Sequence, residues 1–182
     1  MAEAAQQGAG RRTSPLRIIG WGFAAFLILL PLVAMQFTDE VDWTGADFIF
    51  AGILIGGTGL LFELVARKSP GNAYRAGAAA AIMNSFLLIW INAAVGVIGD
   101  DNPANLLFLG VILLALVGAI LARFRPEGMA RSMAVAAAAT ALIGIYALTV
   151  EFREAVLTWG FAGVWLMSAA LFRIAARQQA KG

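Results

Sequence analysis

Six long apolar segments, separated by short polar links, restrict the fold of this chain more than any other feature. They cover residues 17–37, 46–66, 74–98, 104–124, 130–150 and 155–175. Each holds about 20 residues, which lets an α-helix cross the roughly 30 Å hydrocarbon core of a bilayer. Because a helix satisfies its own backbone hydrogen bonds in lipid, we expect an all-α, six-transmembrane-helix bundle over residues 17–176.

The composition and the short links support this architecture. Hydrophobic residues make up 61% of the chain and charged residues 13%, against about 45–50% and about 25% in a soluble domain. Short links force neighbouring helices to run antiparallel, which predicts three antiparallel helical hairpins. Residues 1–16 are polar and basic, so we expect a disordered tail there, with a short second tail over residues 177–182.

Charge is distributed unevenly between the two sides of this arrangement. Arg153 is the one basic residue on its side. The other twelve lysines and arginines lie on the opposite side: Arg11, Arg12, Arg17, Arg67, Lys68, Arg75, Arg123, Arg125, Arg131, Arg173, Arg177 and Lys181. The positive-inside rule places this second side, and with it both termini, in the cytoplasm.

An internal threefold repeat is one interpretation of the arginine spacing. Arg17, Arg75 and Arg131, which begin alternate helices, are 58 and 56 residues apart. Three tandem hairpins would give this pattern. Any array of hairpins that obeys the positive-inside rule would also give it, so both interpretations stay open.

The absence of cysteine and histidine from the sequence excludes several kinds of chemistry. Disulfides, zinc sites with Cys or His ligands, haem held by His or Cys, and serine–histidine hydrolysis all need one of these residues. We therefore expect no catalytic residues, no metal and no cofactor. The basic residues lie at helix ends rather than on one face, so a nucleic acid partner is not expected either.

The third segment carries the polar residues that are most unusual for a membrane span. Asn84 and Asn92 are eight residues apart, and both can face the bundle interior. An amide in hydrocarbon needs a partner, so these residues are either interhelical hydrogen-bonding groups or part of a path for a polar solute. Trp90 and Trp165 lie too deep for an interfacial belt, and the asparagines are candidate partners for their indole N–H groups.

Glu63 is the acidic residue that lies within a predicted span, near its cytoplasmic end. Arg67 follows one helical turn later, which favours an ion pair between the two side chains. Because ionisable groups in spans are often functional, a proton-carrying role is the alternative.

A loop on the outer side gathers a second set of polar residues. Asp100, Asp101 and Asn105 offer hard oxygen ligands and form a candidate cation site, although calcium prefers six to eight such ligands. Asn102 precedes Pro103, a pairing typical of a helix N-cap followed by proline at the first helical position.

Small residues mark the expected helix contacts. Glycine lets two helices approach closely, and the second segment contains four glycines within eight residues: Gly52, Gly56, Gly57 and Gly59. We expect the second helix to lie inside the bundle, packed through Gly52 and Gly56. The alanine runs 76–81 and 136–139 predict similar faces on the third and fifth helices.

Two stretches, FELVARK (62–68) and WINAAVGVIGDDNPAN (90–105), resemble small multi-pass membrane proteins of bacteria that have no assigned function. The resemblance implies a bacterial inner-membrane location and brings no activity, cofactor or site residue with it.

Three functional classes remain open from the sequence. The first is a non-enzymatic membrane subunit or accessory protein that works through helix contacts, either with other membrane subunits or as a homo-oligomer in the lipid bilayer. The second is a small transporter or channel that uses Asn84, Asn92 and Glu63. An enzyme is the third, and it is disfavoured because the chain lacks the usual catalytic groups.

Overall fold

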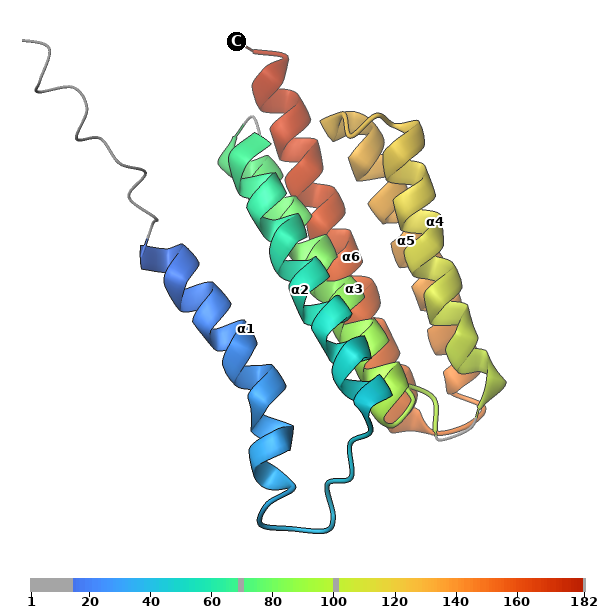
Figure 1. The fold of residues 1–182 in the computed structure, drawn as a ribbon. Helices are drawn as coiled ribbons and strands as arrows, with labels where there is room; N and C mark the ends of the chain where they lie inside the picture. The colour runs from blue at the N-terminus through green and yellow to red at the C-terminus, as the bar shows by residue number, and fades with distance from the viewer. Residues whose placement is uncertain (1–14, 69–70, 100–101, 182) are drawn as a thin grey trace, which may run out of the picture. The chain divides into compact units, whose positions relative to one another are not determined.

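A computed structural model describes residues 15–68, 71–99 and 102–181 of the chain. These residues form six α-helices and a short 3-10 helix, with no strand among them (Figure 1). The elements are α1 (Pro15–Ala34), α2 (Gly45–Lys68), α3 (Asn72–Ala94), η2 (Pro103–Asn105), α4 (Leu106–Leu121), α5 (Pro126–Ala147) and α6 (Phe152–Gln179). The predicted all-α class is confirmed for these residues. Most of the expected tail, residues 1–14, lies outside them.

Five of these helices, α2 to α6, are long and apolar enough to cross a membrane. The apolar part of α1, Ile18–Ala34, is shorter. At 1.5 Å per residue it measures about 26 Å, slightly less than a typical hydrocarbon core. The chain therefore has the character of a multi-pass helical membrane protein.

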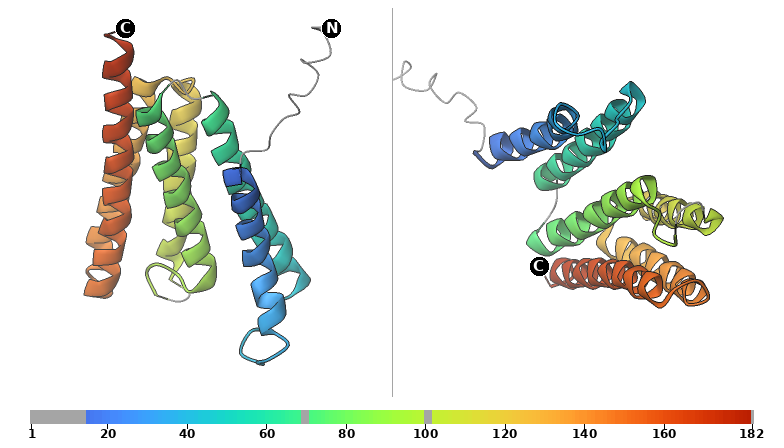
Figure 2. Two further views of the ribbon diagram at one scale, coloured as in Figure 1. Left: turned by 90° about the vertical axis from the view of Figure 1, so that its left-hand side faces the viewer. Right: turned by 90° about the horizontal axis from the view of Figure 1, so that it is seen from below.

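The chain divides into two compact units, and the boundary falls within α2. The amino-terminal unit is residues 1–60 and the carboxy-terminal unit is residues 61–182. Within the second unit, α3, α4, α5 and α6 run alternately in opposite directions as a four-helix bundle (Figures 1 and 2). We call these four helices the α3–α6 bundle.

The packing order inside the α3–α6 bundle agrees with one expected hairpin, α5 with α6, and differs from another, α3 with α4. Helix α6 packs against both α5 and α3, and α4 packs against α5. The third and fourth helices, which short loops predict to be close partners, touch only slightly. Their connection runs over residues 95–105, so its length leaves α4 free to pack on α5 instead.

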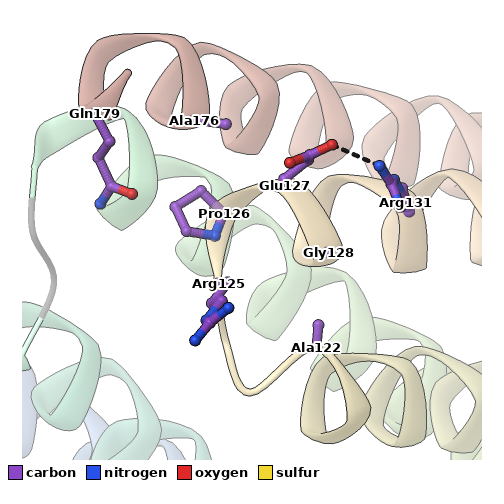
Figure 3. A pocket seen from close by; sticks show the side chains of 8 residues that line it. All are labelled: Ala122, Arg125, Pro126, Glu127, Gly128, Arg131, Ala176 and Gln179. Carbon is purple, nitrogen blue, oxygen red and sulfur yellow. Dashed lines mark hydrogen bonds and ion pairs between the residues drawn. The ribbon is translucent and has the colours of Figure 1, made fainter. Parts of the chain in front are cut away.

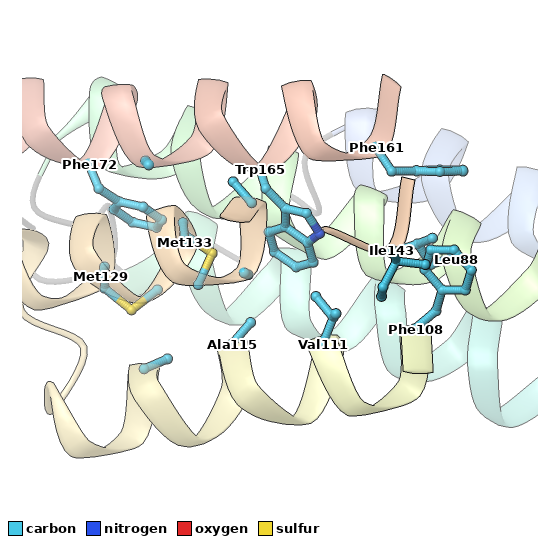
Figure 4. Close-up of a cluster of buried hydrophobic side chains, with 14 of the residues drawn as sticks. Leu88, Phe108, Val111, Ala115, Met129, Met133, Ile143, Phe161, Trp165 and Phe172 are labelled. Carbon is cyan, nitrogen blue, oxygen red and sulfur yellow. The ribbon is translucent and has the colours of Figure 1, made fainter. Parts of the chain in front are cut away.

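Large side chains fill the centre of this bundle and small ones separate its helices. Trp165, Phe108, Phe172 and Leu88 are almost completely buried (Figure 4). The alanine face expected on α5 is present, since Ala136 and Ala137 are also buried. Alternating bulky and small residues in this way allows dense packing between neighbouring helices.

Three glycines of the bundle lie at tight helix contacts. A Cβ atom added at Gly77 would lie 3.2 Å from Leu171 Cβ and 3.3 Å from the Ser168 carbonyl oxygen on α6. Added carbons at Gly118 and Gly144 would collide with Ser132 and Trp159 respectively. These positions require glycine because a larger residue would push the helices apart.

The glycines of α2 that we expected at helix contacts behave differently. A Cβ added at Gly52, Gly56 or Gly57 would meet no atom within 4 Å. Only Gly59 of the set touches a neighbour, the Trp21 ring of α1, at 3.4 Å. The expected close packing through Gly52 and Gly56 is therefore not found within the amino-terminal unit. The glycine pattern alone did not reveal whether a partner helix is present.

Several helix ends also differ from the predicted spans, for local backbone reasons. Helix α3 ends at Ala94 rather than residue 98, because Gly96 adopts a left-handed φ of 69°. Helix α4 stops at Leu121, before Arg123 and Phe124, whose φ angles are 51° and 58°. Helix α5 begins earlier than expected, at Pro126, since proline suits the first helical turn.

Candidate functional site

Asn84 lies in the interior of the α3–α6 bundle, as the sequence predicts. Its side chain is 1% exposed, and its Nδ2 donates a hydrogen bond to the Phe161 carbonyl oxygen of α6 at 3.3 Å. The Oδ1 atom is buried and accepts no hydrogen bond from the described residues. Asn84 therefore joins two helices through its amide nitrogen and leaves one acceptor unused.

Asn92 lies on the same side of α3, two turns further along the helix. Its Nδ2 donates to the Leu88 carbonyl oxygen of its own helix at 2.7 Å. Its Oδ1 is buried and, among the described residues, also lacks a donor. The two asparagines thus present a pair of unused acceptors along one side of α3.

The two deep tryptophans do not share a site. Trp90 lies roughly opposite the Asn84–Asn92 side of α3 and stacks on Phe86, with ring centroids 5.8 Å apart. Trp165 points into the bundle, where its Nε1 has no hydrogen-bond acceptor among the described residues. The expected bond between this indole and an asparagine is therefore not formed.

Glu63 forms the ion pair that its spacing predicts. Its Oε1 lies 2.6 Å from Arg67 Nη2, one helical turn along α2. The Glu63 side chain is 18% exposed and that of Arg67 is 62% exposed. This geometry supports the ion-pair interpretation, and the proton-carrying alternative stays a prediction.

In the outer-loop candidate, the two described residues, Asn102 and Asn105, make hydrogen bonds that hold the loop in its conformation. Asn102 Oδ1 accepts a hydrogen bond from the Ala104 amide and caps η2, with Pro103 at its first position. Asn105 Oδ1 accepts from the amides of Val97 and Ile98, and its Nδ2 donates to the Gly99 carbonyl. The cap interpretation is confirmed.

The two aspartates of the same candidate, Asp100 and Asp101, lie outside the described residues. Within residues 15–68, 71–99 and 102–181, no three Asp, Glu, His or Cys side chains gather as metal ligands would. The cation site stays a prediction.

Two surface grooves were not anticipated from the sequence. One, of about 420 Å³, lies between α3 and α6 and is lined mainly by apolar side chains, with Asn84 among its lining residues. The other, of about 450 Å³, lies where α4 connects to α5, beside the end of α6 (Figure 3). The arginines of this second groove had been interpreted as topology signals alone, and no motif in the sequence distinguishes them.

Comparison with known proteins does not assign the chain to a family: no family model, curated protein or solved structure matches it. Any functional argument therefore rests on the residues of the chain itself.

Proposed function

We propose that the protein is a non-enzymatic membrane subunit or accessory protein that binds a partner membrane protein through the open face of α2. The observation that carries the proposal is the empty space beside Gly52, Gly56 and Gly57. We call these three residues the open glycine face.

Glycine in the middle of a helix lowers the stability of that helix. A glycine face without a packing neighbour therefore suggests that a partner helix packs there. Each glycine destabilises a helix by about 1 kcal/mol relative to alanine. Gly77 and Gly118 of the α3–α6 bundle offset that cost, because other helices contact them closely. The open glycine face has no such contact within the amino-terminal unit. A transmembrane helix of another protein, approaching as closely as small residues allow, would provide it.

The charge distribution supports a particular orientation for this subunit. Twelve of the thirteen basic residues would lie on the cytoplasmic side, together with both termini, in a bacterial inner membrane. In this orientation the partner is a membrane protein of the same bilayer.

Purification in mild detergent tests the proposal. A tagged chain should retain a membrane protein partner, and Gly52→Leu with Gly56→Leu should release it, because two leucines fill the approach. Gly110→Leu in α4 is a matched control, since a Cβ there also meets nothing within 4 Å. A second copy of this chain as the partner would make the face a homo-oligomer contact. Partner retention unchanged in the double variant would refute the proposal.

A second candidate function, transport of an ion or a small polar solute, is favoured by the unused acceptors Asn84 Oδ1 and Asn92 Oδ1. Buried acceptors without donors are costly in hydrocarbon unless water or a solute reaches them. The double variant Asn84→Leu with Asn92→Leu separates the two functions. If the protein transports, the variant stays folded and loses flux in reconstituted vesicles. If it acts through helix contacts, partner retention is unchanged and no flux is lost.

A further inference from the structure

The groove between α4 and α5 has the charge and position of an anion site at a membrane surface. It measures about 450 Å³ and is lined by Ala122, Arg125, Glu127, Gly128, Arg131 and Gln179, among others. These residues come from the end of α4, the start of α5 and the end of α6 (Figure 3). All three are membrane-spanning candidates, so the groove lies where their apolar segments end.

The groove carries a net positive charge. Arg131 Nη2 pairs with Glu127 Oε1 at 2.5 Å, whereas no carboxylate among the described residues pairs with Arg125. Arg123 and Arg177, both exposed, belong to the same end of the bundle. Among the residues that line the groove, Glu127 is the acidic one. Arg125 therefore offers an unpaired guanidinium, a group whose planar donors suit phosphate oxygens.

Exposed apolar residues neighbour two of the groove-lining residues, Ala122 and Arg125, in the chain. Leu121 is 78% exposed and Phe124 is 55% exposed. The Tyr74 hydroxyl of α3 donates to the Phe124 carbonyl oxygen at 2.9 Å and fixes the turn that carries Arg123 and Phe124. The guanidinium of Arg125 and the exposed hydrocarbon of Leu121 and Phe124 thus belong to the same segment at the end of α4.

We propose that this groove binds the phosphate of an anionic phospholipid headgroup, with the acyl chains lying along the last turns of α4. Basic pockets between transmembrane helices are suited to such headgroups. Free phosphate would satisfy the same guanidinium groups but would leave Leu121 and Phe124 uncovered. The exposed hydrocarbon therefore favours the lipid as the source of the phosphate.

Native mass spectrometry of the detergent-solubilised full chain tests the site. Phosphatidylglycerol should remain bound where phosphatidylcholine does not, because only the former carries net negative charge. Arg125→Gln and Arg131→Gln should each weaken phosphatidylglycerol binding about fivefold. Arg153→Gln is the matched control, since Arg153 is an exposed arginine at the opposite end of the bundle that pairs with Glu151. Equal binding by wild type and by a variant that combines Arg125→Gln with Arg131→Gln would overturn the proposal.

Two further arms complete the test. Glu127→Gln should tighten phosphatidylglycerol binding because it frees Arg131 and removes the negative charge; weaker binding in this variant would count against the site. Millimolar inorganic phosphate should not displace the lipid. Full displacement would identify free phosphate as the ligand and overturn the lipid assignment. The helical circular dichroism of each variant should match that of wild type, because all four substituted side chains are exposed.

Discussion

Three glycines of the α3–α6 bundle, Gly77, Gly118 and Gly144, lie where helices touch. In α2, by contrast, a Cβ added at three of the four glycines that we expected at contacts would meet no atom within 4 Å. Gly77 lies against the backbone of α6, and the Ser168 hydroxyl of that helix donates to the Gly77 carbonyl oxygen at 2.8 Å. A Cβ added at Gly52, in the amino-terminal unit, would meet no atom within 4 Å. Helices α2 and α3 are both apolar, and they differ in whether another helix packs against their glycines.

The difference extends to the polar contacts. In the bundle, the Ser132 hydroxyl of α5 donates to the Ala115 carbonyl of α4 at 2.9 Å, and Asn84 joins α3 to α6. In α2, Thr58 donates to the Leu54 carbonyl of its own helix at 2.7 Å. The bundle thus contains hydrogen bonds between helices in addition to bonds within one helix, such as that from Asn92 to Leu88. The helices of the bundle are thus joined by polar contacts, and the lack of such a contact at Thr58 fits the proposal that α2 binds a partner.

The same substitution in both regions tests this contrast with the largest expected effect. Gly77→Leu should lower the free energy of unfolding by about 3 kcal/mol or more, because even a Cβ there crowds the backbone of α6. Gly52→Leu should leave it unchanged or raise it slightly, since leucine favours the helix and meets open space. Titration with sodium dodecyl sulfate, followed by tryptophan fluorescence, measures both.

Gly77→Ala provides a milder version if the leucine variant fails to fold. It should cost less than Gly77→Leu and more than Gly52→Ala. Equal losses at residues 77 and 52 would show that α2 is packed as tightly as α3, and the contrast would fail.

Substitutions in the connections between helices should also destabilise the bundle more than the amino-terminal unit, with smaller changes in the free energy of unfolding. Asn105→Ala should lower the free energy of unfolding by about 2 kcal/mol, because the amides of Val97 and Ile98, both on buried residues, would lose their acceptor. Asp47→Ala, which removes the bonds from Thr44 to Asp47 Oδ2, should cost about 1 kcal/mol or less, since water can replace an exposed cap.

Hydrogen exchange locates these losses. Asn105→Ala should speed exchange at Val97 and Ile98, and Asp47→Ala should speed it only in the first turn of α2. A larger loss for Asp47→Ala than for Asn105→Ala would contradict the contrast.

Local spacing made some features predictable from sequence. The Glu63–Arg67 pair and the Asn102 cap depend on residues within one helical turn of each other, so their geometry follows from the chain itself. The membrane character of the helices follows equally directly from length and hydropathy. Asn84 was expected in the interior because an amide exposed to lipid would lack a partner.

Contacts between distant segments were harder to predict. Helix α3 packs on α6 rather than chiefly on α4, because Gly77 and Ser168, 91 residues apart, fit together. A glycine in a sequence does not reveal whether another helix lies against it, so the sequence favours Gly52 and Gly56 as contacts and does not single out Gly77. The groove beside Arg125 likewise depends on three helix ends that meet only in the fold.

Two ion pairs of equal spacing, one on α2 and one on a helix of the α3–α6 bundle, should have the smallest effect on the free energy of unfolding. Glu63–Arg67 on α2 and Glu127–Arg131 on α5 both join residues four apart. Exposed pairs contribute about 0–1 kcal/mol, so Glu127→Gln, in a pair exposed on both sides, should change the free energy of unfolding by less than about 1 kcal/mol. Glu63→Gln should also cost about 1 kcal/mol or less, because its partner Arg67 is largely exposed although Glu63 is not. A loss of several kcal/mol for Glu63→Gln alone would instead indicate a buried charge pair. Glu63 would then lie in a tight contact, as its place in the carboxy-terminal unit allows, and the contrast between α2 and the bundle would hold only for residues before 61.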